Sequence, residues 1–275
     1  MRPALPTAAL AIALALVTAT VAPAAADAGR PAWSTGDFWA YAYTGSVFPT
    51  ITGPGTYRLE VVGIDTVSLG GTSYESYRVR LSLNGSNVVQ FHGGDNWYRT
   101  SDLSLVKTTF NVTATILFVQ ATFVVTVTYD PPLAIQWPLV TAGTWTTSST
   151  RDIVAGIPLG STLLDATFVV EAPSTVTVPA GSFETTPLRD RTGERSTTYW
   201  APGAGNYARR QTFNANDQET SSAELTSFRY QGGGFLGLPI LAWVLIIALV
   251  VAVVLAVAVG RRRRATMPPR GQPPG

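Results

Sequence analysis

The sequence predicts a mainly β protein: a curved antiparallel sheet, either a half-barrel or two sheets, built from two pseudo-repeats and followed by one C-terminal transmembrane helix. Three observations lead to this fold class. Turn-forming clusters recur about every 8–12 residues between residues 33 and 230. The stretches TVSLGGTSYESYRVRL (66–81) and TVTVPAGSFETTPLRD (175–190) resemble each other without a gap. Residues 238–259 form an uncharged apolar run.

The first 26 residues have the composition of a secretory signal peptide. Arg2 provides the positive start, residues 8–21 an apolar run, and Ala24–Ala26 a small-residue cleavage site. The run is shorter than the roughly 20 residues that a membrane-spanning helix needs. We therefore predict a signal peptide over residues 1–26, cleaved after Ala26, with an uncleaved N-terminal anchor as the alternative.

Alternating polarity predicts a β-hairpin over residues 104–130. From Phe110 to Phe118 apolar side chains occupy every second position, and the same period of two recurs from Phe123 to Tyr129. No stretch before the apolar run at 238–259 shows a helical period. Four turns are expected in the domain, at Asn84-Gly85, Gly93–Asn96, Arg191–Gly193 and Asn214–Asp217.

The repeated stretches belong to a longer series of matched segments. WSTGDFWAY (33–41) corresponds to WPLVTAGTWT (137–146), and GGDNWYR (93–99) to GAGNYAR (203–209). We interpret the series as a duplication, with pseudo-repeats at about 33–100 and 137–210, although β-rich sequences also resemble one another by chance. Because a unit of roughly 70 residues cannot cover both faces of its sheet, we expect the two units and the hairpin at 104–130 to share one core.

The second unit carries a family resemblance. Its segments TVTVPAGSFETTPLRD, YWAPGAGNYARR and AELTSFRY resemble a group of secreted prokaryotic domains of unknown function, with a VPAG-x-[FY] turn followed by YW-x-APG-x-G. These domains look like relatives of the lipoprotein-carrier half-barrels. The resemblance implies a curved antiparallel sheet around an apolar cavity. The carriers plug that cavity with helices, and the sequence shows no such plug but does show a membrane helix.

The C-terminal region predicts the membrane anchor. Residues 231–237 form a Gly-rich linker, 238–259 the span and 260–275 a basic, Pro-rich tail. At about 1.5 Å per residue the span reaches roughly 33 Å, which matches a hydrocarbon core of about 30 Å. Arg261–Arg264 keep the tail in the cytoplasm, so we predict a single-pass cell-membrane protein with its N-terminal domain extracytoplasmic. A buried core helix is the alternative.

The charge of the chain argues against a nucleic-acid partner. Its net charge is +2, but six of its 19 basic residues lie in the signal peptide and the tail. The remainder carries 13 basic against 17 acidic residues, so the electrostatic basis for binding nucleic acid is missing. The chain has no cysteine, which excludes disulfides and a lipidated N-terminal cysteine.

The residue types that carry catalysis are sparse. His92 is the one histidine, and no Gly-x-Ser-x-Gly context surrounds a serine. Glu75 and Glu184 occupy equivalent repeat positions, and we expect each to pair with an arginine such as Arg80 or Arg189 rather than to form a hydrolase pair. We predict no catalytic residue, no metal ligand and no cofactor.

Two further patterns are candidates for modification or weak ion binding. Asn84 and Asn111 each begin an N-glycosylation sequon and are glycosylation candidates in a secreted chain. The turn at Asn214–Asp217 could bind calcium weakly, but a plain turn is the simpler interpretation.

The leading functional hypothesis is a non-enzymatic, membrane-anchored extracytoplasmic domain that binds an apolar or lipidic ligand in the concavity of its sheet. Its partners are the lipid bilayer, through residues 238–259, and that ligand. An envelope domain that binds protein or polysaccharide is the alternative, and an unrecognised carboxylate hydrolase is the second alternative. The ligand-binding candidates are aromatic residues: Trp39, Tyr41, Trp97, Trp145, Tyr199 and Trp200.

Overall fold

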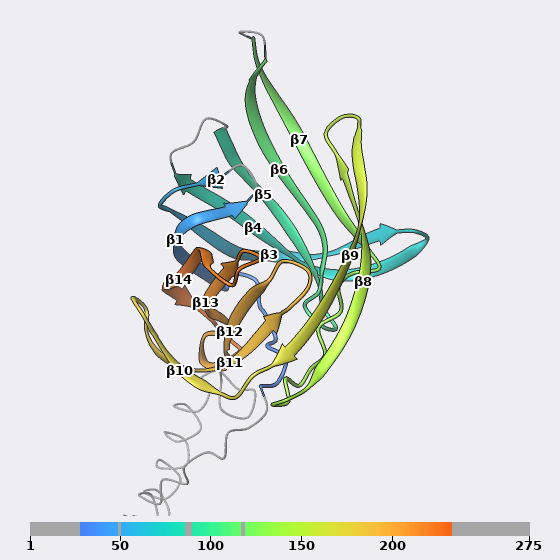
Figure 1. The fold of residues 1–275 in the computed structure, drawn as a ribbon. Helices are drawn as coiled ribbons and strands as arrows, with labels where there is room; N and C mark the ends of the chain where they lie inside the picture. Colours follow the sequence, from blue (N-terminus) through green and yellow to red (C-terminus); the bar gives the residue numbers. More distant parts are fainter. Residues whose placement is uncertain (1–27, 49–50, 86–89, 117–118, 233–275) are drawn as a thin grey trace, which may run out of the picture.

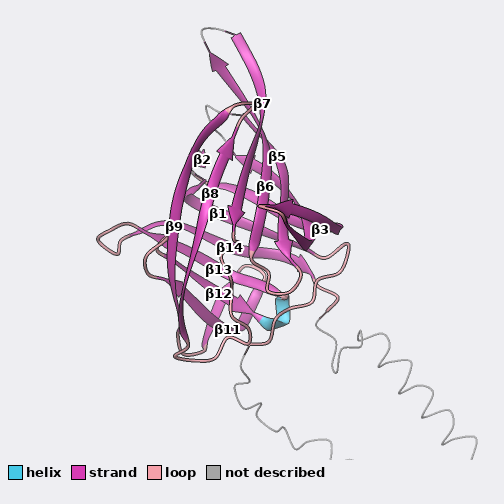
Figure 2. Ribbon diagram, turned by 90° about the vertical axis from the view of Figure 1, so that its right-hand side faces the viewer, coloured by secondary structure: helices cyan, strands magenta, loops and turns pink. Residues whose placement is uncertain are grey.

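The computed structural model describes residues 28–48, 51–85, 90–116 and 119–232, and there one antiparallel sheet closes on itself as a barrel (Figure 1). The twelve barrel strands, in order around the ring, are β1 (Phe38–Phe48), β3 (Gly55–Leu69), β4 (Thr72–Gly85), β5 (Gln90–Arg99), β6 (Leu105–Ile116), β7 (Val119–Asp130), β8 (Thr144–Val154), β9 (Pro158–Val170), β11 (Gly181–Asp190), β12 (Ser196–Ala201), β13 (Asn206–Phe213) and β14 (Glu219–Arg229). Strands β2 (Ile51–Thr52) and β10 (Ser174–Val178) extend the sheet beside β1 and β11, and the short 3-10 helix η1 (Pro202–Ala204) precedes β13 (Figure 2).

Two pairings between strands that are not consecutive in sequence complete the ring. β1 pairs with β14 from Phe38–Arg229 to Gly45–Ser221, and β11 pairs with β9 at Leu188–Val170. The predicted antiparallel β architecture is confirmed, but the predicted half-barrel or two-sheet arrangement is wrong. A half-barrel would leave the N–H and C=O groups of two long edge strands unpaired, and closure pairs them with each other.

The two ends of the barrel differ. We call the end with the turns at 155–157, 191–195 and 214–218 the mouth, and the end with segments 99–104 and 131–143 and η1 the tail end. The described chain both enters and leaves at the tail end. Ala28 forms a β-bridge with Leu139, and the Gln231 backbone N–H donates to the Asp37 carboxylate at 2.9 Å.

Ring contacts identify the inward face of the strands. Tyr41 in β1 stacks on Tyr57 in β3 and on Tyr207 in β13, with ring centroids 4.9 and 4.5 Å away. β13 and β1 are separated by β14, so these rings can converge only on the concave side of the sheet. Residues directly opposite each other in an antiparallel pair point to the same side, so the register assigns the inward face of the other strands.

Coil segments fill the tail half of the barrel. The indole N–H of Trp33 donates to the Gly205 carbonyl at 2.7 Å, and that of Trp137 donates to the Asp102 carbonyl at 2.8 Å. The inward residues of the neighbouring strands there are buried: Trp39, Tyr41, Leu59, Val61, Val79 and Leu225. The plug that the sequence did not reveal is therefore formed by loops, because their tryptophans supply the apolar volume that helices would otherwise provide.

The number of strands leaves space for such a plug. A barrel of about eight strands is just filled by its own side chains, and one of about sixteen encloses an aqueous channel. With twelve strands this barrel lies between those limits. Its own side chains do not fill it, so inserted segments, a ligand or water occupy the interior.

Two of the four predicted turns are correct and two are strands. The turns at Arg191–Gly193 and Asn214–Asp217 are confirmed as the β11–β12 and β13–β14 connections. Asn84-Gly85 instead continues β4, where Gly85 pairs with Gly55. Gly93–Asn96 lies within β5, where the register shift between Phe91 and Gly94 marks a bulge and Gly93 has φ +89°. The glycine at position 93 therefore allows a β-bulge, and the chain does not reverse direction there.

The two repeated sequence stretches fold into similar local structures. Residues 66–81 and 175–190 each form a hairpin with the same register, since Thr66 opposes Glu75 and Thr175 opposes Glu184. The later matched segments fall in different elements: 93–99 lies in β5, whereas 203–209 spans η1 and β13. β6 and β7 pair as a hairpin within the range 104–130. The duplication and the domain boundaries stay predictions.

Within the part of the chain that the structure describes, no helix combines the length and apolar character needed to cross a membrane. The predicted signal peptide at 1–26, most of the linker, the span at 238–259 and the tail at 260–275 lie outside the described residues.

Candidate ligand-binding lumen

A group of tyrosines occupies the middle of the barrel. Tyr41 donates from its hydroxyl to the Tyr207 carbonyl at 3.0 Å, and the hydroxyls of Tyr57 and Tyr207 lie 2.8 Å apart. Burial raises the pKa of Tyr41, Tyr57 and Tyr207, and also that of Tyr98 from β5. These phenols therefore stay protonated and available as hydrogen-bond donors at physiological pH.

Arg210 lies in the same interior. The register shift at Tyr199 and Trp200 makes Tyr207 and Arg210 both point inward from β13, although they are three residues apart. The negative charge of Glu194, on the β11–β12 turn, forms an ion pair with Arg210 and raises its pKa. The Arg210 side chain is still 39% exposed. Because it points inward, that exposure shows that solvent reaches the interior.

Arg151 is a second inward guanidinium. It lies directly opposite Tyr129 in the β7–β8 pair. The charges of Glu194, Arg151 and Arg210 all act on the Tyr129 hydroxyl, whose pKa is raised chiefly by burial. The Arg151 guanidinium makes no hydrogen bond or ion pair to any residue that the structure describes, and its Nε atom is buried.

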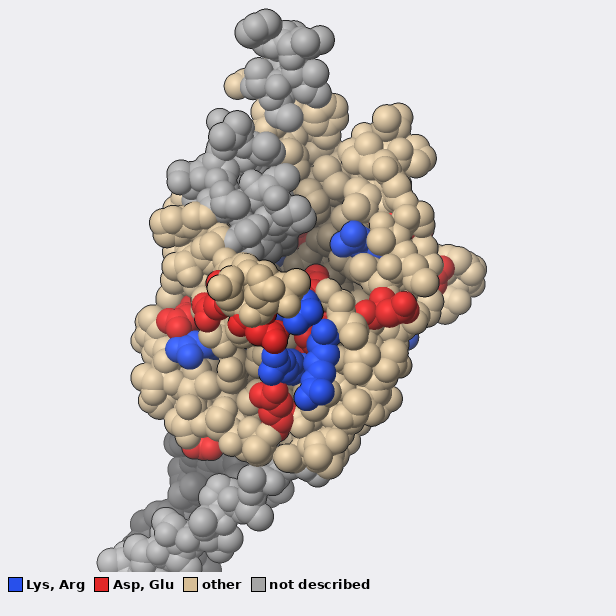
Figure 3. Space-filling view, in the orientation of Figure 1, with Lys and Arg blue, Asp and Glu red and all other residues tan. Residues whose placement is uncertain are grey.

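Apolar side chains line the wall between these arginines and the mouth. On β7, Phe123 and Val125 share the inward side with Tyr129, and Val112 of β6 lies opposite Phe123. On β8, Ile153 points inward on the mouth side of Arg151. On β9, Leu164 points inward opposite Ser149, on the tail side of Arg151. All five are only partly buried, unlike the inward residues of the tail half. The face seen in Figure 3 is hollowed above the front strands, in agreement with an accessible mouth half.

The interior therefore changes character along its axis. From the mouth inward, an apolar wall on β6–β8 leads to Arg151, Arg210 and Tyr129, and then to the stacked tyrosines and the tryptophan-rich plug. Such a lumen can hold a molecule with an apolar body and a polar end.

The predicted aromatic candidates divide between the two sides of the wall. Trp39, Tyr41, Trp145 and Trp200 point inward, and the indole N–H of Trp200 is buried without a hydrogen-bond partner among the described residues. Trp97 and Tyr199 point outward. Trp97 carries Lys107 above its ring at 4.8 Å, and Tyr199 lies opposite Arg209.

Sequence reasoning missed the residues that give the lumen its polarity: Arg151, Arg210, Tyr57, Tyr98, Tyr129 and Tyr207. Arg151 could have been found from the sequence STRDIV (149–154): in a strand, Arg151 lies on the same side as Ile153, which is two residues away and apolar. For Arg210 the sequence gives no such signal. The bulge at Ala208 interrupts the alternation of β13, so residues on either side of it that point inward are not an even number of positions apart.

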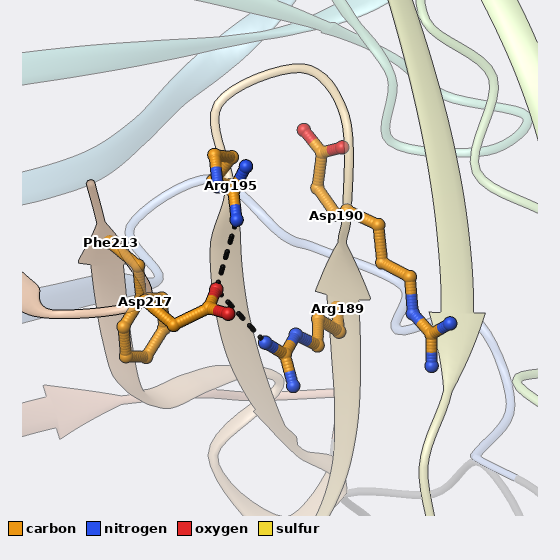
Figure 4. A pocket seen from close by; sticks show the side chains of 6 residues that line it. Arg189, Asp190, Arg195, Phe213 and Asp217 are labelled. Atoms are coloured by element: carbon orange, nitrogen blue, oxygen red, sulfur yellow. Dashed lines mark hydrogen bonds and ion pairs between the residues drawn. The ribbon is translucent and has the colours of Figure 1, made fainter. Parts of the chain in front are cut away.

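A second pocket, of about 270 Å³, lies on the outer face at the mouth (Figure 4). Its lining includes Arg189, Arg191, Arg195 and Asp217. Asp217 pairs with Arg195 at 3.0 Å and with Arg189 at 3.6 Å. Figure 3 shows acidic residues beside the basic ones over this face. Most of the positive charge is therefore already compensated, which weakens the pocket as an anion site.

The other predicted sites are placed as follows. Glu75 and Glu184 lie in separate hairpins, and each accepts a hydrogen bond from a threonine, at 2.9 and 2.7 Å, not from the expected Arg80 or Arg189. Arg80 lies 3.9 Å from Asp95, and Arg189 pairs with Glu171 and Asp217. The structure does not present the two glutamates as a carboxylate pair.

The remaining candidates concern modification and metals. Asn84 on β4 and Asn111 on β6 are both exposed, and their glycosylation stays a prediction. His92 belongs to β5, and its side chain lies outside the described part of the structure. Among the described residues no group of three or more His, Cys, Asp or Glu side chains is placed to hold a metal ion. The Asn214–Asp217 turn is held by its own hydrogen bonds, with the Asn214 side chain accepting from two backbone N–H groups.

Comparisons with known proteins add little. No protein-family model and no curated protein matches the chain. Among solved structures, a predicted lipoprotein from Parabacteroides distasonis superposes with a TM-score of 0.42 and 9% identity, covering 74% of this chain and 99% of the other. A likeness this weak transfers neither fold nor function. The similarity to the lipoprotein-carrier half-barrels stays a prediction, and the function below rests on the chain's own residues.

Proposed function

We propose that the protein is a non-enzymatic, membrane-anchored extracytoplasmic domain that holds a lipid-like ligand in the mouth half of its barrel. The observation that carries the proposal is the partial exposure of inward side chains. Arg210 points into the barrel and its side chain is 39% exposed. The inward apolar residues near the mouth, Val112, Phe123, Val125 and Ile153, are also only partly buried. Apolar side chains facing an accessible interior favour an apolar occupant, because covering them removes their surface from water.

The anchoring part of the proposal rests on the sequence. Residues 238–259 have the length and composition of a span, and the barrel ends six residues before it, at Gly232. Together with the signal peptide predicted at 1–26, this supports the proposal that the barrel lies outside the membrane and the tail at 260–275 in the cytoplasm.

The direct test is extraction of the full-length protein, purified from its membrane, followed by mass spectrometry of the organic extract. We expect a defined lipid class at close to one molecule per protein, beyond the bulk lipid recovered with an unrelated single-span protein. The proposal is wrong if the extract matches that of the control protein and the extracted protein then takes up no added lipid.

A paired substitution locates the site. Val125→Trp places an indole on the inward apolar wall, and Thr126→Trp places the same indole on the outer side of the same strand. Val125→Trp should reduce the bound lipid severalfold, whereas Thr126→Trp should leave it unchanged. Equal effects of the two variants would place the lipid outside the lumen.

The alternative function, binding to an envelope protein or polysaccharide, has an observation of its own. The β8–β9 hairpin exposes Ile157 and Leu159 at the mouth and Leu163 farther along β9, each by 60% or more. Large exposed apolar residues in one hairpin are typical of an interaction surface. If this surface is the functional one, Leu159→Asp should abolish capture of the partner while the lipid extract stays unchanged.

A further inference from the structure

We propose that the lumen selects amphiphiles with an acidic head group, and that Arg151 and Arg210 hold this group beside Tyr129. The inference rests on the lumen-binding function proposed above and names the class of ligand. It is argued from three observations: the partners that each inward arginine has or lacks, the side chains around the two arginines, and the direction in which the apolar wall runs.

Arg151 is the main evidence. Its guanidinium has no hydrogen-bond or ion-pair partner among the described residues, and its Nε atom is cut off from solvent by the protein. The residue as a whole is half-buried, so part of its hydration is retained, but the guanidinium still has N–H donors without an acceptor on the part of the protein that the structure describes. A carboxylate or phosphate supplies the missing acceptors, because guanidinium binds both through two parallel N–H···O hydrogen bonds.

Arg210 has a partner that a ligand can replace. Its counter-ion is Glu194, whose side chain is 65% exposed and lies on the β11–β12 turn at the mouth. The Asp190 carboxylate holds this turn by accepting from the backbone N–H groups of Thr192, Gly193 and Glu194. The turn therefore keeps its shape when the Glu194 side chain moves aside. The Nε atom of Arg210 is also buried without a partner.

Tyr129 connects the two arginines. It faces Arg151 across the β7–β8 pair, and it lies close enough to Arg151, Arg210 and Glu194 for all three charges to act on its hydroxyl. As a neutral phenol it can donate a third hydrogen bond to an anion held by the guanidinium groups.

The position of the apolar wall sets the orientation of the ligand. From Tyr129 toward the mouth, the inward positions of β7 are Val127, which is buried, and then the partly exposed Val125 and Phe123. On β8, Ile153 follows Arg151 in the same direction. A ligand whose acidic end reaches the arginines therefore extends its apolar chain along β7 and β8 toward the mouth. A neutral amphiphile can use the same wall but leaves the guanidinium groups without acceptors.

The test measures binding of three radiolabelled probes with one hydrocarbon chain and different head groups: dodecanoate, dodecyl phosphate and 1-dodecanol. The full-length protein is held in lipid nanodiscs at pH 8, and uptake by empty nanodiscs is subtracted. We expect at least one acidic probe to bind about 10- to 100-fold more tightly than the alcohol, as a charge-assisted hydrogen bond predicts. Comparison of the two acidic probes shows whether the site prefers carboxylate or phosphate.

Two variants separate the lumen from the outer pocket. Arg151→Gln removes the inward guanidinium and should abolish the preference for acidic probes while binding of the alcohol is retained, which also shows that the barrel is folded. Arg191→Gln removes an exposed arginine of the outer pocket and should change nothing.

The possible failures are distinct. Equal binding of all three probes overturns the head-group assignment and leaves the lumen-binding function standing. Loss of the preference in Arg191→Gln but not in Arg151→Gln overturns it in favour of the outer pocket. No binding of any probe removes the proposed function and the head-group assignment with it.

Discussion

Arg151 is a residue at which stability and the proposed binding oppose each other. It points into the barrel opposite Tyr129, is half-buried and has no acceptor among the described residues, so its buried Nε atom loses hydration without a compensating contact. Glu194 compensates Arg210 but not Arg151. Sites that hold a ligand often reduce the stability of the empty protein in this way.

We predict that Arg151→Met stabilises the empty protein by about 0.5–2 kcal/mol, because a flexible apolar side chain fills the same space without an unpaired charge. Urea unfolding at pH 7 measures the change. Arg80→Met on the outer face, where the side chain is 56% exposed, serves as the matched control and should change the free energy of unfolding by less than about 0.5 kcal/mol. Destabilisation by Arg151→Met would mean that the guanidinium has a structural role.

The buried tyrosines predict loss of stability at alkaline pH. Burial raises the pKa of Tyr41, Tyr57, Tyr98 and Tyr207 in the folded state, whereas the unfolded chain releases these protons near pH 10. These tyrosines therefore contribute fully to the free energy of unfolding below about pH 10. Above that pH the free energy of unfolding falls, by up to about 1.4 kcal/mol per pH unit for each tyrosine that stays protonated in the folded state.

Urea unfolding between pH 8 and 11, together with tyrosinate absorbance, checks this expectation. The buried tyrosines should ionise only as the protein unfolds, and Tyr57→Phe should reduce the slope of stability against pH. Tyrosinate formation by all ten tyrosines before unfolding would contradict the buried cluster.

At the scale of the elements, β5 shows how a glycine pair can suggest the wrong structure. Gly93-Gly94 resembles a turn, but both residues lie in the strand, beside a bulge. Gly94 is required because β6 passes close to it: a Cβ atom there would lie 1.8 Å from the Thr109 carbonyl oxygen. The sequence shows that glycine is needed, and only the neighbouring strand shows why.

We predict that Gly94→Ala lowers the free energy of unfolding by about 1–3 kcal/mol, because β5 and β6 must separate to admit the methyl group. Gly63→Ala in β3 is the control, since a Cβ atom there meets nothing within 4 Å, and it should leave stability unchanged or slightly raised. Urea midpoints of the two variants give the comparison, and equal midpoints would argue against the close β5–β6 contact.

At the scale of the whole molecule, the position of the chain ends orients the barrel. Ala28 and Gln231 are both held at the tail end, so the mouth lies at the opposite end from the chain termini of the domain. The five residues between Gly232 and the predicted span extend at most about 18 Å. A tether this short keeps the tail end near the membrane, so the mouth should open away from the bilayer.

Fluorescence energy transfer to an acceptor lipid tests this orientation, and the absence of native cysteines makes single labels straightforward. Gly203→Cys labels the exposed tail end near η1, and Ala215→Cys labels the β13–β14 turn at the mouth. In the reconstituted full-length protein we expect efficient transfer from position 203 and weaker transfer from position 215. The reverse order would mean that the barrel presents its mouth to the membrane.

Particular segments show how much of the fold and of the site could be predicted from the sequence. The alternation in 104–130 gave the β6–β7 hairpin, and the repeat gave two hairpins with the same register, because residue pairing within a hairpin depends on neighbours close in sequence. The candidates Trp39, Tyr41, Trp145 and Trp200 do point inward. Trp97 and Tyr199 do not, because aromatic character alone does not set the side of a strand that a residue occupies.

The sequence by itself determined that this chain is built of antiparallel strands, since a period of two and frequent turn residues are local properties. Closure of the barrel, the loop plug and the meeting of Arg151, Arg210 and Tyr129 were decided by the tertiary structure alone. The physical reason is the same in each case. The β1–β14 pairing joins the two ends of the domain, the β9–β11 pairing passes over β10, and the bulge in β13 shifts its register against β12. Each depends on how one segment packs against another, and no periodicity within one strand records it.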